Sequence, residues 1–201
     1  MRIVKTIALL GALAALAAGC KVTELHPLFT PGERVFQPTL LGTWTSQAGG
    51  AQWRVSRGKD RSYVFAWSGN GLTRTCQAVL GRSVNDYFLE FGPARDPLPG
   101  NPLEAPLYLL AKLQFRGSEV ALSFLDAEVL RNLARARAGG GPQPWGGLPR
   151  PETLLGRQGG ADAPLVLSAD TGGLKEIFAF LYHHPEAFAP ARPVDTYLLQ
   201  R

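Results

Sequence analysis

The chain has little of what most catalytic sites are made from. Of its 201 residues, 3 are histidine and 2 are cysteine. His183 and His184 are neighbours on a predicted helix, where successive side chains point about 100° apart, so we do not expect them to chelate one metal ion. The sequence contains no Gly-x-Ser-x-Gly, and its glycine-rich stretches lack the lysine and the strand–loop–helix context of a phosphate-binding loop.

Acidic residues are also sparse, and none forms an obvious pair. Those considered as possible acid–base groups are isolated along the chain and are expected to be solvated: Glu90, Glu104, Glu119 and Glu128. Because glycosidases need two carboxylates flanking the scissile bond, the sequence nominates none for that chemistry. We therefore expect no enzyme, no catalytic or metal site and no cofactor; a hydrolase with an unrecognised site is the catalytic alternative.

The charge of the chain is modest. There are 21 basic and 16 acidic residues, which gives a formal net charge of +5. The basic residues are scattered among acids rather than gathered into one stripe interleaved with aromatics. We therefore expect no nucleic-acid partner.

The first twenty residues carry the clearest signal. Arg2 and Lys5 precede an apolar run over residues 7–18, and small residues follow up to Cys20. The run is too short to span a bilayer, which takes about 20 residues, and this arrangement is typical of a secretory signal peptide. An ordinary secretory signal with a chance cysteine is the alternative to the interpretation that follows.

The run from Leu16 to Cys20, Leu-Ala-Ala-Gly-Cys, resembles the lipobox of bacterial membrane lipoproteins. The resemblance implies a diacylglycerol on the Cys20 sulfur, an acyl chain such as palmitate on its new amine, and a mature chain that starts at Cys20. In that family an Asp after the cysteine favours the inner membrane, and here Lys21 stands there. We therefore expect a lipid-anchored protein of the bacterial cell envelope, in the outer membrane. Cys76 would then be the only thiol left and is expected to be a small buried hydrophobe.

The chain is expected to contain one folded domain. We predict a signal peptide over residues 1–19, a lipidated N-terminus with an extended proline-containing tether over residues 20–40, and a single β-rich domain over residues 41–201. Gly and Pro are frequent over about residues 139–163, which favours a flexible insertion; a ligand-gating lid that contacts its ligand through Trp145 is the alternative.

Short alternating runs separated by turn residues dominate the domain, and this pattern is typical of an antiparallel meander. We predict strands over residues 41–46, 52–57, 62–67, 72–80, 87–91, 107–116 and 119–124, a short strand over 165–167, and an edge or closing strand over 194–199. Helices are predicted over residues 127–138 and 171–183, each capped by the aspartate before it, Asp126 and Asp170. The fold is thus expected to be mainly β, a curved sheet or lipocalin-like barrel with two short helices in the C-terminal half.

Gly42-Thr43-Trp44 in the first of these strands resembles the Gly-x-Trp that opens the barrel of lipocalins. The resemblance implies a barrel with Trp44 packed inside it. Aromatic residues at strand spacing would line an apolar cavity if they point inward, although plain core is the alternative interpretation. They are Trp44, Trp53, Tyr63, Phe65 and Trp67.

Three functions follow from these observations. The first is a membrane-anchored, non-catalytic structural or interaction module that contacts another envelope protein or the cell wall. The second is a lipocalin-like carrier of a lipid or another small hydrophobic ligand. The third is the hydrolase named above, which a buried pair of polar groups in a cleft would support.

Overall fold

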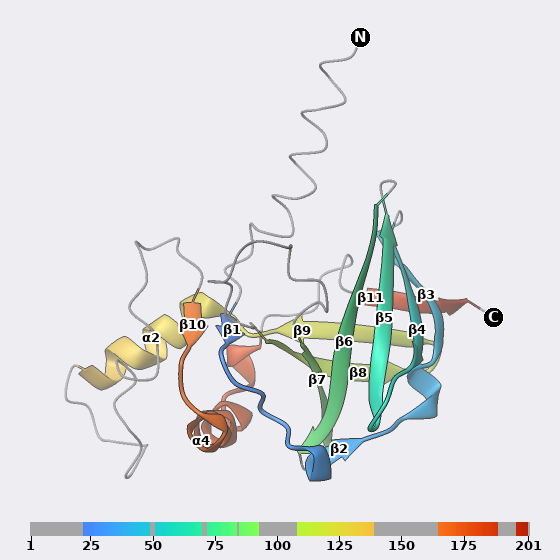
Figure 1. Cartoon of the computed structure of the whole chain (residues 1–201). Coiled ribbons are helices and arrows are strands. Elements are labelled where there is room, and N and C mark those ends of the chain that lie inside the picture. Colours follow the sequence, from blue (N-terminus) through green and yellow to red (C-terminus); the bar gives the residue numbers. More distant parts are fainter. Residues whose placement is uncertain are drawn as a thin grey trace.

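The structure is a computed structural model, which describes residues 22–48, 51–69, 72–83, 85–92, 108–138, 165–188 and 196–200. These residues form a mainly β domain whose antiparallel sheet curls into a half-barrel, with two α-helices in the C-terminal half (Figure 1). The predicted fold class is confirmed. The proposed lipid attachment residue Cys20 and the predicted insertion over residues 139–163 lie outside the described residues.

One side of the half-barrel is a meander of four strands. They are β3 (Gly42–Ser46), β4 (Ala51–Arg57), β5 (Ser62–Gly69) and β6 (Leu72–Ser83). Each pairs antiparallel with the next. β4 and β5 are joined by a tight turn in which Asp60 and Arg61 have φ of 51° and 60°. The predicted alternation holds, because Val55, Tyr63 and Phe65 are buried.

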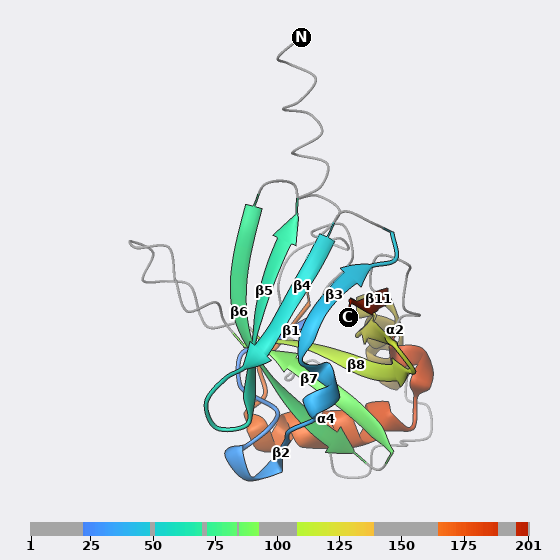
Figure 2. The same ribbon diagram turned by 90° about the vertical axis from the view of Figure 1, so that its right-hand side faces the viewer.

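The other side is built by four more strands (Figure 2). They are β7 (Asp86–Phe91), β8 (Leu109–Arg116), β9 (Glu119–Phe124) and β11 (Thr196–Gln200). β11 pairs with β9 on one edge and with β3 on the other. The long strand β6 pairs with β5 through its first part and with β7 through its second, so the pairings also join the two ends of the sheet.

The segment predicted as a tether is packed onto the domain from Val22 onward, so that part of the prediction was wrong. Residues 22–40 form this N-terminal segment. β1 (Val22–Glu24) pairs in parallel with β10 (Leu165–Leu167), and β2 (Arg34–Val35) pairs with β6. The prolines that suggested an extended chain begin short 3-10 helices instead, η1 (Pro31–Glu33) and η2 (Pro38–Leu40). The apolar side chains of Leu28 and Phe29, just before η1, and of Leu40, at the end of η2, are buried.

Two helices complete the fold. Asp126 precedes α2 (Ala127–Ala138) and accepts hydrogen bonds from the N–H groups of Glu128 and Val129, at 2.8 and 3.1 Å. Asp170 caps α4 (Thr171–Tyr182) by accepting from the Gly173 N–H at 2.8 Å. Both predicted caps are confirmed. The short helix η3 (Pro185–Ala187) follows α4.

The sheet separates two hydrophobic cores, because successive side chains of a strand point to opposite faces. On β7, Phe88 points outward and Leu89 into the half-barrel; on β8, Leu110 and Ala111 divide in the same way. The outer core lies under the N-terminal segment and α4, whose Phe178 ring meets Phe88 edge to face at 4.5 Å. The predicted apolar stripe of α4 is confirmed, since all four members are buried: Leu174, Ile177, Phe178 and Leu181.

Among the described residues, no helix is both long and apolar enough to cross a membrane.

Candidate functional site

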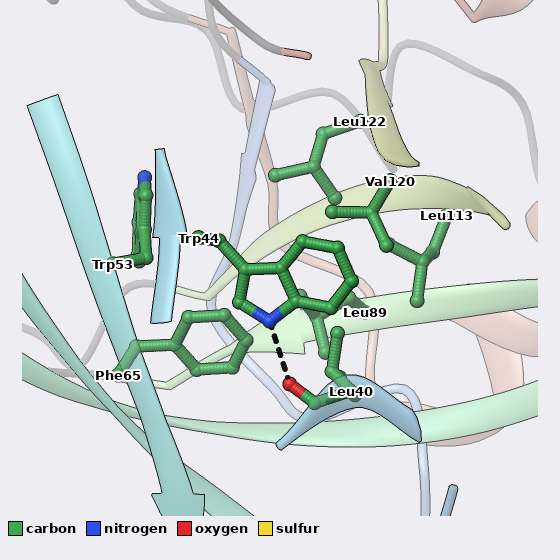
Figure 3. A pocket seen from close by; sticks show the side chains of 8 residues that line it. All are labelled: Leu40, Trp44, Trp53, Phe65, Leu89, Leu113, Val120 and Leu122. Atoms are coloured by element: carbon green, nitrogen blue, oxygen red, sulfur yellow. Dashed lines mark hydrogen bonds between the residues drawn. The ribbon is translucent and has the colours of Figure 1, made fainter. Parts of the chain in front are cut away.

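A small apolar cavity lies in the interior of the half-barrel (Figure 3). Its volume is about 10 Å³, roughly the space that one water molecule needs. Eight apolar side chains line it, from both sides of the half-barrel: Leu40, Trp44, Trp53, Phe65, Leu89, Leu113, Val120 and Leu122. The lining offers a ligand no charged group.

Three of the five aromatic residues predicted to line a cavity do lie there: Trp44, Trp53 and Phe65. Tyr63 is fully buried in the same core, but its hydroxyl accepts from the Gln37 N–H at 2.6 Å, so it fixes the N-terminal segment. Trp67 is half-buried, outside the cavity lining. Its backbone stands directly opposite Trp53, which in turn stands opposite Trp44.

Trp44 is held in place by burial and by one hydrogen bond. Its side chain is 3% exposed, and the indole Nε1–H donates to the carbonyl oxygen of Leu40 at 2.8 Å (Figure 3). Leu40 ends η2, so this hydrogen bond ties the N-terminal segment to the first strand of the half-barrel. A buried indole N–H needs such a partner.

The aromatic rings fill the interior by packing against one another. Phe65 meets Trp53 edge to face at 5.2 Å and Phe91 edge to face at 5.3 Å, and Trp53 lies 5.8 Å from Phe91. Such contacts add about 0.5–1.5 kcal/mol each beyond the burial of apolar area. In this arrangement the aromatic residues behave as core.

Two buried glutamates form a polar cluster that the sequence did not reveal. Glu24 of β1 and Glu90 of β7 are 2% and 1% exposed, so the expectation that Glu90 is solvated was wrong. Glu90 accepts a hydrogen bond from the Leu28 N–H through Oε1, whereas Glu24 Oε2 has no hydrogen-bond partner among the described residues. Glu24 belongs to the N-terminal segment, and Glu90 lies beneath it on the outer face of the sheet.

Burial controls the ionisation of this cluster. It raises the pKa of Glu24 to about 8, and the neighbouring charge of Glu90 adds to the rise. Burial also raises the pKa of Glu90 to about 7, although the N–H groups of Leu28 and Phe29 and the charge of Arg34 act in the opposite direction. At neutral pH the cluster therefore holds protons that two exposed glutamates would have lost.

The burial of these two carboxylates suits a role in docking the N-terminal segment rather than in catalysis. A catalytic carboxylate must reach a substrate or a water molecule, but neither side chain has more than 2% of its surface exposed. No group of three or more histidine, cysteine, aspartate or glutamate residues in the described part of the chain is placed to hold a metal ion. No sequence pattern links Glu24 with Glu90, because only the pairing of β1 and β7 with other strands brings them together.

The remaining candidate residues are two histidines and a cysteine, and each contacts neighbouring groups of the fold. His183 caps the C-terminus of α4, and His184 places Nδ1 2.8 Å from Glu186 Oε1 while its ring stacks on Phe180. Cys76 is half-buried on β6, and burial raises the pKa of its thiol to about 11, so the thiolate needed for nucleophilic chemistry is scarce.

The sequence matches no protein-family model, and neither the curated proteins nor the solved structures compared with it gave a match. A functional interpretation therefore rests on the residues and geometry described above.

Proposed function

We propose that the protein is a bacterial envelope lipoprotein, anchored through Cys20, whose half-barrel serves as a non-catalytic interaction module. The filled interior of the half-barrel is the observation that supports the role as an interaction module. Small-molecule sites occupy about 300–1,000 Å³, whereas the cavity between Trp44, Phe65 and Leu122 holds about 10 Å³. A partner would then bind the outside of the domain rather than its interior.

The surroundings of the buried glutamates also support a non-catalytic role. A buried polar pair in a cleft would have favoured a hydrolase. Glu24 instead lies within the docked N-terminal segment and Glu90 lies under it, both out of reach of a substrate.

The anchor is tested by comparing the two cysteines. Cys20→Ala should abolish incorporation of radiolabelled palmitate and release the protein from the membrane fraction, because the thioether-linked lipid would have no sulfur to attach to. Cys76→Ala is the matched control, since it removes the half-buried thiol of β6 and leaves the signal sequence intact. Equal labelling of the Cys20→Ala protein and the wild type would refute the anchor.

The interaction role is tested by native mass spectrometry of protein purified from its own host, combined with crosslinking in intact cells. We expect no stoichiometric small ligand and a reproducible crosslinked envelope protein. A lipid bound one to one and retained through purification would refute the interaction module.

One observation favours a carrier as the second candidate. The cavity lining is apolar throughout, and the backbone positions of Trp44, Trp53 and Trp67 lie directly opposite one another across three strands. A hydrophobic ligand would have to displace aromatic rings to enter. The bound lipid described in the previous test would establish this candidate in place of the first.

A further inference from the structure

The N-terminal segment is fixed to the domain from its first described residue. Val22 is 1% exposed and stands opposite Leu165 in the β1–β10 ladder. Two residues later, the Glu24 N–H donates to the Tyr108 carbonyl at 2.9 Å and the Tyr108 N–H donates to the Glu24 carbonyl at 2.8 Å. The chain is therefore held by backbone hydrogen bonds on two sides.

The contacts continue along the N-terminal segment, so the residues after β1 are also held against the domain. The Thr171 hydroxyl of α4 donates to the Pro27 carbonyl at 2.8 Å, and Lys175 of α4 forms an ion pair with Glu33 at 2.7 Å. Between these contacts Leu28 and Phe29 are 2% and 7% exposed. A segment held at this many points cannot serve as a spacer.

The distance between the proposed anchor and the folded domain is correspondingly short. Cys20 lies two residues before Val22, and two extended residues span at most about 7 Å. The headgroup layer on each side of a bilayer is about 5–7 Å thick, taken as half the difference between the full thickness and the hydrocarbon core. A chain lipidated at Cys20 would thus bring Val22 to the outer edge of the headgroups.

We infer that the domain lies directly against the lipid surface, with the Val22 end of β1 facing the membrane, rather than standing away from it on a tether. The inference rests on the lipid anchor proposed above. It assigns the bilayer as a contact partner of the folded domain.

Two exposed residues mark the two ends of β4. Ala48 precedes β4, and Lys59 lies in the turn between β4 and β5. Dyes at both positions report how far the half-barrel stands from the lipid, whichever end of β4 lies nearer.

Energy transfer to the membrane tests this contact. Donor dyes are placed on the lipidated protein by Ala48→Cys or Lys59→Cys in a Cys76→Ala background. The protein is reconstituted into phosphatidylethanolamine and phosphatidylglycerol vesicles that carry an acceptor dye on their headgroups. We expect transfer from both positions, because a domain in contact with the lipid keeps both dyes near the acceptor layer.

The matched control restores a spacer between Lys21 and Val22. A flexible Gly/Ser insertion of about 18 residues has a root-mean-square span of about 23 Å, so transfer from both positions should fall by about half or more. Transfer that the insertion leaves unchanged would overturn the inference.

Mass spectrometry of the same samples separates this inference from the anchor proposal. If the wild-type protein carries no lipid on Cys20, both proposals fail. If the protein is lipidated but the insertion leaves the energy transfer unchanged, only the inference about the lipid surface fails.

Discussion

Gly81 offers a direct test of how the N-terminal segment is docked. It lies in β6 beneath the Phe29 ring, and a Cβ added there would come within 2.1 Å of Phe29 Cε1 and 2.3 Å of Cζ. Carbon atoms in contact are separated by about 3.5–4.0 Å. Gly81→Ala must therefore push the Phe29 ring off the sheet or shift the strand.

The loss of stability caused by Gly81→Ala can be estimated in two ways. Overpacking a core by a methyl group destabilises a protein by about 1–3 kcal/mol. Complete loss of Phe29 from its buried site, where it is 7% exposed, would cost about 1.5–3 kcal/mol of hydrophobic stabilisation. We therefore expect the free energy of unfolding to fall by about 1–3 kcal/mol, and Tm to fall by about 2–4 °C for each kcal/mol.

The measurement is urea and thermal unfolding followed by circular dichroism. Gly32→Ala is the matched control, because Gly32 lies in η1 of the same segment and a Cβ there meets no atom within 4 Å. The cause is isolated by repeating Gly81→Ala in a Phe29→Ala background, where the added methyl group should cost much less. If Gly81→Ala is no less stable than Gly32→Ala, or costs as much without the Phe29 ring, the account of the docking is refuted.

The buried carboxylates and Trp44 give two further predictions. Between about pH 5 and 8 the free energy of unfolding should fall as pH rises, because Glu24 and Glu90 have folded pKa values of about 8 and about 7 against 4.5 ordinarily, so the folded state keeps protons that the unfolded state has lost. Urea midpoints across this range should change less steeply in Glu24→Gln, and identical pH dependence in the variant and the wild type would contradict the assignment. Trp44→Phe should destabilise by about 1–3 kcal/mol in the same urea assay, because it leaves the buried Leu40 carbonyl without its donor. Trp67→Phe, at a half-buried position, is the control, and equal losses in the two variants would show that the hydrogen bond contributes nothing.

Local patterns predicted the half-barrel well, because strand alternation and helix caps depend on residues close together in the sequence. The alternation of Tyr63 and Phe65 gave a strand with one buried face, and Asp170 gave the start of α4. Trp44, Trp53 and Phe65 could be assigned to the interior for the same reason. Whether the interior is empty depends on how the side chains of opposite strands fill space, and no alternation pattern contains that information.

The N-terminal segment could not be placed by the same reasoning. Pro31 and Pro38 favour an extended chain locally, but proline also fits the first position of a helical turn, which it occupies in η1 and η2. The apolar pair Leu28 and Phe29 was the one signal of packing, and its partners, such as Gly81, are distant in sequence. The burial of Glu24 beside Glu90 follows from this docking. The sequence could therefore predict neither the docking of the segment nor the burial of the two glutamates.

The position of β11 has a consequence for the order in which the molecule folds. Residues about 150 positions apart stand opposite each other where Leu199 meets Trp44, and β11 fills the place between β3 and β9. Until residues 196–200 are available, both neighbouring strands present open edges. A chain that becomes available from its N-terminus would thus remain unable to complete its sheet until residues 196–200 appear, and in the interval the edges of β3 and β9 are open to pairing with other chains.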